Sequence, residues 1–312
     1  MALDPTYGYT LPMLRQVGAP PPPDDFAEFW TGLYERARLV DPAPVARPSG
    51  PDGALRDVEF TSLDGIRVGG WLSLPADGRV ERGLVVGHGY GGRAAPDAAI
   101  PVERAAVLYL CSRGMPARGR VPGIPDTARE HVLHGIAARD TYVHGGCAAD
   151  VWCAVSALCR LVPQAAARVD YLAGSFGGGI GALAVPWDER IRSACLVVPS
   201  FGNHPLRLTL PCTGSGEAVR RYARDHPEVR GVLSYFDAAT AATFLRVPTH
   251  VGLALADPAV PPPGQFAVYN ALAGPRERFL LTAGHTEYAG KADEARALLA
   301  AQHDFLTSEH DR

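Results

Sequence analysis

Six short apolar runs, separated by segments with helical patterning, restrict most strongly the fold that this chain can adopt. The runs are GLVVGHG (83–89), AAVLYLCS (105–112), VDYLAGS (169–175), SACLVVPS (193–200), THVGLALAD (249–257) and RFLLTAGH (278–285). Parallel strands read as continuous apolar runs when helices cover both faces of their sheet. Helical patterns fall at about 140–161, 177–186, 264–273 and 289–307. The alternation predicts an α/β fold with a doubly wound, mostly parallel sheet and right-handed crossovers.

The first fifty residues follow a different pattern. A proline run is followed by Asp24 and Asp25, either of which is a candidate helix cap. The helix expected next carries a set of apolar side chains on one side, namely Phe26, Phe29, Trp30 and Leu33. Residues 41–53 are proline-rich and are interpreted as a linker. On either side of Asp64-Gly65, apolar and polar residues alternate along the chain, which predicts a β-hairpin.

Residues about 200–245 also fit the βα rhythm poorly, and we interpret them as a helical insertion over the sheet's edge. We therefore expect one α/β domain over residues 1–312, with an N-terminal extension at 1–50 and a cap-like insertion near 200–245. A chain of 312 residues that is 47% hydrophobic can bury a core of that size.

Charge and targeting signals exclude several classes of function. The net charge of −3 and the pI near 6.4 argue against a nucleic-acid partner or an anionic membrane surface. Neither a secretion signal nor a membrane-spanning stretch is evident, so a cytoplasmic protein is expected. The six cysteines show no metal-ligand spacing and are interpreted as small core residues in a reducing compartment.

The segment VDYLAGSFGGGIGALAV (169–185) places one serine among glycines where a strand should become a helix. One interpretation is a simple turn in which Ser175 caps the helix. The other is a nucleophile elbow, whose tight turn requires small residues around the serine. The usual pattern is G-x-S-x-G, and Ala173 occupies its first position here. Alanine is small enough to keep the turn possible.

Two further polar residues end strands at the same edge of the predicted sheet. Asp257 follows the run at 249–257, and His285 ends the run at 278–285. The chain order Ser175, Asp257, His285 is the order expected of an α/β-hydrolase triad, in which the imidazole takes the serine proton and the carboxylate orients the imidazole. Asp257 alone could equally be a turn residue, because Pro258 follows it. Glu287 or Asp293 would be the next candidates for the carboxylate.

An oxyanion hole completes this chemistry. The backbone N–H groups of Phe176, directly after the serine, and of Tyr90, in the GHGYGG segment after the strand at 83–86, are the expected donors. Neither role requires a particular side chain.

Metal and nucleotide sites are weaker interpretations. His131, His134 and His144 lack the H-E-x-x-H order and a convincing further ligand. The glycines near Ser175 are not followed by a lysine, and no acidic residue is suitably placed for a ribose. We expect neither a metal nor another cofactor.

The chain resembles the acetyl xylan esterase and cephalosporin C deacetylase family, carbohydrate esterase family seven, over nearly its whole length. The segments that carry the resemblance are PPPDDFAEFW, GHGYGG, Arg113-Gly114, HVLHGIAARDTYVHGG, AGSFGGG, LSYFDAATAA, ADPAVPPPGQFAVYNAL and AGHTEY. The resemblance implies an α/β-hydrolase fold, metal-free hydrolysis of small acetyl esters and often a hexameric ring. It supports Ser175, His285 and Asp257 as nucleophile, base and orienting carboxylate, and Tyr90 and Phe176 as oxyanion donors.

Three departures from the family pattern lie near the expected site. Met115-Pro116 replaces the usual Gln-Gly after Arg-Gly, Phe176 replaces a glutamine, and Thr286 stands where a glutamate usually follows the histidine. We expect Phe176, Met115 and Pro116 to line an apolar pocket mouth. The expected reaction is removal of an acetyl or other short acyl group from a small-molecule ester, possible substrates including a secondary metabolite rather than acetylated xylan. The alternative is a non-hydrolytic relative that binds a ligand or acts as a cyclase or acyltransferase.

Overall fold

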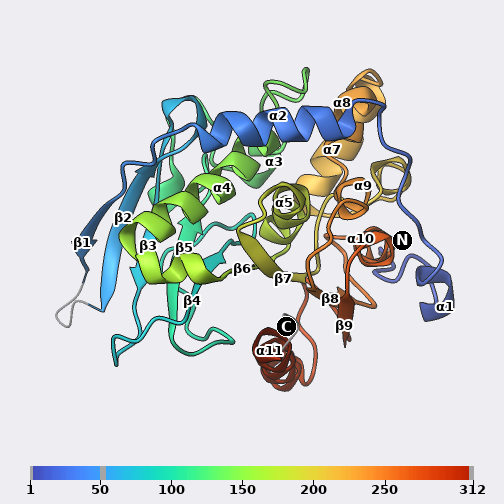
Figure 1. Ribbon diagram of the computed structural model, residues 1–312. Coiled ribbons are helices and arrows are strands. Elements are labelled where there is room, and N and C mark those ends of the chain that lie inside the picture. Colours follow the sequence, from blue (N-terminus) through green and yellow to red (C-terminus); the bar gives the residue numbers. More distant parts are fainter. Residues whose placement is uncertain (1–2, 50–53, 309–312) are drawn as a thin grey trace.

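The computed structural model describes residues 3–49 and 54–308 and is built around one nine-stranded sheet (Figure 1). The strands are β1 (Val45–Pro48), β2 (Leu55–Thr61), β3 (Arg67–Ser73), β4 (Arg82–Val86), β5 (Ala105–Cys111), β6 (Val169–Gly174), β7 (Ile191–Val197), β8 (Thr249–Ala254) and β9 (Arg276–Leu281). They lie in the order β1-β2-β3-β5-β4-β6-β7-β8-β9. The pairs from β1 to β5 are antiparallel and those from β5 to β9 are parallel, which confirms the mostly parallel sheet.

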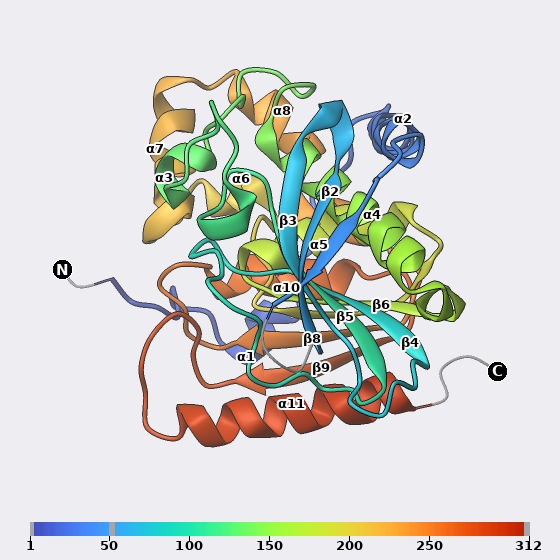
Figure 2. The ribbon, with the colours of Figure 1, turned by 90° about the vertical axis from the view of Figure 1, so that its left-hand side faces the viewer.

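Helices cover both faces of this sheet. They are α1 (Leu11–Leu14), α2 (Phe26–Arg38), α3 (Ala128–His131), α4 (Val143–Leu161), α5 (Phe176–Ala184), α6 (His204–Arg207), α7 (Gly214–Asp225), α8 (Val229–Tyr235), α9 (Ala238–Ala242), α10 (Pro262–Ala271) and α11 (Lys291–Thr307). Short 3-10 turns occupy Leu63–Gly65, Ala117–Gly119, Pro163–Ala167 and Val185–Trp187. Helix α4 packs on β4 and β5 and α5 on β6 and β7, whereas α11 runs along the opposite face (Figures 1 and 2). The four predicted helices correspond to α4, α5, α10 and α11.

Most of the apolar runs are buried, as their composition predicts, but the last one is not, because only Leu281 of strand β9 is buried. Every residue of β5 and β8 is buried, and four of the five residues of β4 are buried. The predicted hairpin is also present, because β2 pairs antiparallel with β3 from Leu55 opposite Ser73 to Thr61 opposite Arg67. Because the strands from β5 to β9 are parallel, their carboxyl ends all lie on the same side of the sheet.

The proline-rich linker prediction is wrong for part of its length. Val45–Pro48 forms strand β1, which pairs antiparallel with β2 at the edge of the sheet. Proline is tolerated there because an edge strand has one side free of the hydrogen-bond ladder. Residues 50–53 of the predicted linker lie outside the described residues.

The predicted cap of the first long helix is also wrong in its mechanism. Asp25 directly precedes α2, but its side chain makes no capping hydrogen bond. The carboxylate instead accepts from Arg139, at 2.6 Å, and from the Tyr235 hydroxyl. Trp30, fully buried on the same helix, donates its indole N–H to the Tyr235 carbonyl at 2.8 Å. Helix α2 is therefore tied to α8, as their proximity in Figure 1 suggests.

The region near 200–245 is helical, as expected, and contains α6, α7, α8 and α9. It connects β7 to β8, which are neighbouring inner strands, so it does not arise from a lateral edge strand. Helix α9 packs against α5 and α10, and α7 packs against α3. The buried Asp237 carboxylate caps α9 through Ala239 and Thr240 and also accepts from the amides of Asn203 and His204. This carboxylate joins the two ends of the insertion.

Within the described part of the chain, no helix combines the length and the apolar character needed to cross a membrane. All six cysteines are free thiols, and five of them are buried. The interpretation of the cysteines as core residues agrees with this burial.

Candidate active site

Ser175 lies in a strained turn between the end of β6 and the start of α5. Its backbone has φ 55° and ψ −118°, a region that residues with a Cβ rarely adopt. The turn is held from both sides, because Ser175 N donates to the Val197 carbonyl at 2.8 Å and Ser200 N donates to the Ser175 carbonyl at 3.1 Å. The local geometry is that of a nucleophile elbow.

The small residues around Ser175 are explained by close backbone contacts. A Cβ on Gly177 would lie 2.7 Å from the His88 carbonyl oxygen and 2.9 Å from the Cβ of Ala173. A Cβ on Gly87 would lie 3.0 Å from the same Ala173 atom. Alanine at 173 is accommodated because both of its neighbours, Gly87 and Gly177, lack a side chain. The departure from G-x-S-x-G therefore leaves the turn intact.

The structure brings Ser175, His285 and Asp257 into one hydrogen-bonded chain. Ser175 Oγ lies 2.8 Å from His285 Nε2, and His285 Nδ1 lies 2.8 Å from Asp257 Oδ2. Because an ionised carboxylate only accepts, Nδ1 carries the proton and Nε2 is free to accept from the serine. The Asp257 side chain is fully buried, whereas 30% of the His285 side chain is exposed. The alternative carboxylates are used elsewhere, Glu287 by Lys291 and Asp293 by Arg296.

The Asp257 carboxylate is saturated with donors. Oδ1 accepts from the amides of Ala259, at 2.9 Å, and Val260, at 3.0 Å. Oδ2 accepts from His285 and from Gln265 Nε2, at 3.2 Å. Each oxygen of the carboxylate therefore accepts two hydrogen bonds, which hold it in a fixed orientation. We call Asp257, His285, Gln265 and the two amides the Asp257 cluster.

Gln265 was not singled out from the sequence. It is fully buried on α10, donates to the Val260 carbonyl at 2.7 Å and accepts from Ala254 N at 2.8 Å. A buried glutamine on an otherwise apolar helix face was the available signal. Gly284 was missed too, although a Cβ there would collide with the Asp257 carboxylate.

The two expected oxyanion donors flank Ser175. Phe176 follows it directly, and Gly89, which precedes Tyr90, is close enough that a Cβ there would lie 3.7 Å from Ser175 Cβ. Within the described residues, no carbonyl accepts from the backbone N–H of Tyr90 or of Phe176. Both amides are therefore available to a ligand.

His88, which sequence reasoning did not single out, helps to fix the Tyr90 loop together with Gly92 N, which donates to the Gly89 carbonyl at 3.0 Å. Its Nε2 accepts from Ser112 N at 3.0 Å, so its Nδ1 carries the proton and donates to the Gly89 carbonyl at 2.7 Å. Burial lowers the pKa of His88 to about 4, which keeps the ring neutral. In a trans peptide the C=O and N–H point in opposite directions, so holding the Gly89 oxygen also sets the direction of the Tyr90 N–H.

The expected apolar mouth is wrong for two of its three residues. The side chains of Phe176 and Met115 are fully buried. The Phe176 ring packs 4.3 Å from the Tyr90 ring, centroid to centroid, in a cluster with Phe201 and the histidines described next. An aromatic ring gains more by filling this interior space than by facing solvent. Only Pro116 is partly exposed.

The histidines considered for a metal serve this interior instead. His144 Nε2 lies 3.0 Å from the Tyr90 hydroxyl, and His131 Nε2 lies 2.9 Å from the Arg113 carbonyl. Both rings pack near Phe176, with centroid distances of 6.1 and 5.9 Å. His134 lies apart from them, at the wall of a separate cavity.

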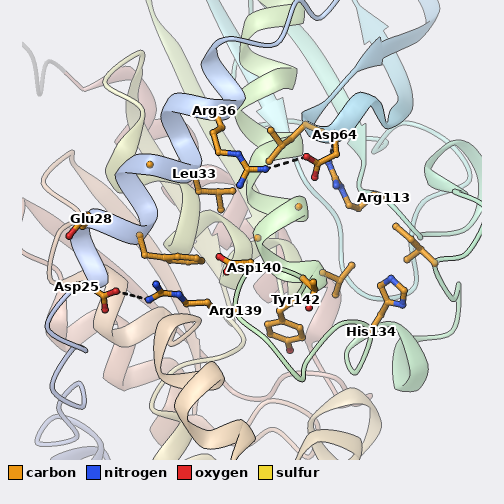
Figure 3. A pocket seen from close by; sticks show the side chains of 18 residues that line it. Asp25, Glu28, Leu33, Arg36, Asp64, Arg113, His134, Arg139, Asp140 and Tyr142 are labelled. Atoms are coloured by element: carbon orange, nitrogen blue, oxygen red, sulfur yellow. Dashed lines mark hydrogen bonds and ion pairs between the residues drawn. The ribbon is translucent and has the colours of Figure 1, made fainter.

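That separate cavity has a volume of about 630 Å³ and lies between α2, the turn at 63–64 and the start of α4 (Figure 3). Two ion pairs border it, Arg36 with Asp64 at 3.2 Å and Arg139 with Asp25 at 2.6 Å. None of Ser175, Asp257 and His285 lines this cavity. Its size is therefore not a guide to the chemistry.

Comparisons with known proteins agree with the geometry. The sequence model of the acetyl xylan esterase family matches residues 12–303. An acetyl xylan esterase from Paenibacillus sp. R4 has a similar structure, with a TM-score of 0.80 and 24% identity over 94% of this chain and 99% of that chain. For acetyl xylan esterase 1 from Thermoanaerobacterium sp. JW/SL YS485 the TM-score is 0.78, with 22% identity over 94% and 98%.

More distant similarity extends to peptidases of the same fold. An acylaminoacyl peptidase from Pyrococcus horikoshii has a TM-score of 0.60 and 13% identity over 87% of this chain and 42% of that chain. These structural likenesses establish the α/β-hydrolase fold, and the family match covers almost the whole sequence. The chain belongs to the acetyl xylan esterase family and is a carboxylic ester hydrolase.

Proposed function

We propose that this protein removes an acetyl or other short acyl group from an alcohol, with Ser175 as the nucleophile, His285 as the general base and Asp257 as the orienting carboxylate. The observation that carries the proposal is the unbroken chain of two 2.8 Å contacts from Ser175 Oγ through His285 to Asp257. A serine hydroxyl becomes a useful nucleophile only when a positioned base takes its proton.

Acylation follows from this arrangement. Ser175 Oγ attacks the ester carbonyl carbon while its proton passes to His285 Nε2. The bond to the alcohol oxygen then breaks, and His285 returns the proton to that oxygen, which leaves an acyl group on Ser175. Asp257 stabilises the imidazolium and keeps its tautomer. Water, deprotonated by the same imidazole, releases the acid and restores Ser175.

The tetrahedral oxyanion formed in each step needs hydrogen-bond donors. The Tyr90 and Phe176 amides are proposed to supply them, a role supported by their free N–H groups beside Ser175. Loss of one such donor typically costs about 2.7–4 kcal/mol in the barrier. Because His88 helps to fix the Gly89–Tyr90 peptide, it acts as a positioning residue for one of them.

The family name points to acetylated xylan, but we propose a different alcohol for this chain. The support is that Met115 and Phe176 stand where the family has polar residues, and that both side chains are fully buried rather than exposed to a sugar. A secondary metabolite, with cephalosporin-C-type acetyl esters as one class, fits the proposal. We further propose, from the family resemblance, a homo-oligomer such as a hexamer and a cytoplasmic location. A non-hydrolytic role is not favoured, since nothing in the triad is missing.

Turnover of 4-nitrophenyl acetate tests the proposal most simply. The wild-type protein should hydrolyse it, and Ser175→Ala should abolish turnover while leaving the thermal unfolding temperature nearly unchanged. Ser112→Ala, which alters a nearby serine outside the hydrogen-bonded chain, is the control and should remain active. Retained turnover in Ser175→Ala would contradict the proposal.

A further inference from the structure

Arg207, the last residue of α6, is a buried cation without a counter-charge. Only 4% of its surface is exposed. Its Nε and Nη1 atoms are buried and have no hydrogen-bond partner, and no ion pair to its guanidinium is found within the described residues. Burying an unpaired charge is costly, so proteins rarely keep one without a use.

The buried and partly buried carboxylates of this region are already occupied. Glu217 accepts from Arg220, at 2.7 Å, and from Arg221, at 2.8 Å. Asp237 accepts four backbone N–H groups, as described above. Asp257, the remaining buried acid of this region, is saturated by its own cluster. The missing counter-charge is not supplied by these groups.

The start of α7 is shaped around the guanidinium. A Cβ on Gly216 would collide with Nη2 of Arg207 and would lie 2.7 Å from Sγ of Cys212. Gly216 therefore has to lack a side chain for Arg207 to occupy its place. We call Arg207, Cys212, Thr213 and Gly216 the Arg207 cluster.

The Arg207 cluster lies against the loop that carries Asp257. Thr213 donates to the Pro258 carbonyl through its amide at 2.8 Å and its hydroxyl at 3.2 Å, and Pro258 directly follows Asp257. Tyr7 donates to the same carbonyl at 3.4 Å. Thr213 of the cluster thus contacts the residue that directly follows Asp257 in the chain.

Electrostatics place the same charge near the Tyr90 loop as well. Burial raises the pKa of Tyr90 and of Tyr7, and the Arg207 charge acts against that rise on both. The Tyr90 hydroxyl contacts His144, and the Tyr7 hydroxyl contacts the Pro258 carbonyl. The Arg207 charge therefore acts both on the interior beside Tyr90 and on the loop that follows Asp257.

We propose that Arg207 forms an anion subsite that binds a carboxylate carried by the ester substrate, next to the bond that Ser175 attacks. This proposal rests on the proposed esterase function. A guanidinium matches a carboxylate with two parallel hydrogen bonds. Because no hydrogen bond holds the Arg207 side chain, it can turn towards the ligand without breaking one. The substrate class is an acylated hydroxy acid or a half-ester of a dicarboxylic acid.

Two matched substrate pairs separate the possible positions of the carboxylate. The first pair, 4-acetoxybenzoate and its methyl ester, differs by a charge on the alcohol side. The second, 4-nitrophenyl hemisuccinate and 4-nitrophenyl pentanoate, differs by a charge on the acyl side. A hydrogen bond to a charged group contributes enough free energy to change kcat/KM by about 10- to 100-fold. We expect Arg207→Met to lower kcat/KM by that factor for the charged member of at least one pair.

The neutral members should change by less than about threefold, because the triad is untouched, and Arg207→Lys should restore part of the preference. Arg221→Met is the control, since Arg221 lies on α7 but is exposed and paired with Glu217. An unchanged ratio of charged to neutral substrate in both pairs after Arg207→Met would overturn the proposal.

Binding measurements make the result independent of catalysis and of folding. Calorimetric titration measures binding without turnover. The ligands 4-acetoxybenzoate and 4-nitrophenyl hemisuccinate are titrated into Ser175→Ala and into Ser175→Ala/Arg207→Met. We expect the second variant to bind at least one of the two anions about 10-fold or more weakly, and added salt to weaken binding to the first. Equal affinities, or no binding of either anion to Ser175→Ala, would overturn the anion subsite even if hydrolysis is observed. If Arg207→Met does not fold, Arg207→Gln, which also removes the charge, provides the same comparison.

Discussion

The Asp257 cluster and the Arg207 cluster are two buried charged sites joined through Pro258, yet they are built in opposite ways. Asp257 accepts four hydrogen bonds, all from groups of this chain. The Nε and Nη1 atoms of Arg207 have no hydrogen-bond partner among the residues that the structure describes. A charge whose partners are supplied by the chain is fixed in place and can orient a neighbouring side chain. A charge without partners is suited to a ligand that brings them.

Breaking the saturated cluster should produce the largest effect. Asp257→Asn keeps the size of the side chain but replaces an acceptor of the His285 proton with a group that favours the wrong tautomer. By analogy with serine proteases, kcat should fall by about 10⁴-fold with the fold preserved. Steady-state kinetics with 4-nitrophenyl acetate measure this. Full activity would place the catalytic carboxylate elsewhere, and Glu287→Gln and Asp293→Asn would then be tested.

The Tyr90 loop provides the next comparison, between two replacements of His88. His88→Asn retains a donor at the position of Nδ1 and so can still hold the Gly89 carbonyl, whereas His88→Gln retains only an acceptor for Ser112 N. We expect His88→Gln to lose up to about 10²- to 10³-fold in kcat, the cost of one oxyanion donor, and His88→Asn to lose much less.

KM and the thermal unfolding temperature serve as controls for these two variants. A misdirected Tyr90 amide should lower kcat with little change in KM, since the donor acts mainly in the transition state. Equal losses of kcat in His88→Asn and His88→Gln would show that the Gly89 contact does not matter.

A smaller effect is expected at the edge of the Asp257 cluster. Gln265→Leu removes one of the two donors to Asp257 Oδ2 and leaves His285 as the other. A hydrogen bond to a charged group contributes about 1.5–3 kcal/mol, so kcat should fall by about 10- to 100-fold. Gln302→Leu, at another buried glutamine, is the matched control and should leave kcat unchanged. The account would be wrong if both variants had the same kcat.

The smallest effect on activity is expected at a buried histidine remote from the site. Burial lowers the pKa of His250 to about 4, so the unfolded chain binds its proton first as the pH falls from about 6.5. The unfolding free energy should therefore decrease between pH 6.5 and 4, and His250 should contribute up to about 1.4 kcal/mol per pH unit to that slope. His250→Phe should flatten the slope without changing kcat, as denaturant titrations at several pH values would report. An unchanged dependence of the unfolding free energy on pH in His250→Phe would contradict the lowered pKa of His250.

The parts that were predictable from the sequence share a physical basis. Buried parallel strands must be apolar throughout, so β5 and β8 were identifiable as runs, and glycines that make room for close backbone contacts marked the turn at Ser175. Chain order along one sheet edge then suggested Asp257 and His285. Because all parallel strands end at that edge, these residues come together in the structure.

The parts that were not predictable depend on contacts between distant segments. The orientation of Phe176 was wrong because its ring fills a space formed by Tyr90 and Phe201, which no local pattern reveals. Strand β1 was missed because it lies within the proline-rich segment 41–53, and because its edge position is set by how the whole sheet assembles. Gln265 and Arg207 carry no motif, and their importance depends on which partners the fold brings to them or withholds.

The central claim is that His285 activates Ser175 for covalent attack, and labelling with a fluorophosphonate tests it most directly. Intact-mass and peptide analysis of the wild-type protein should find one adduct, on Ser175, and His285→Ala should slow its formation by orders of magnitude because the hydroxyl loses its base. Absence of an adduct on Ser175, or equally fast labelling of His285→Ala, would contradict the account.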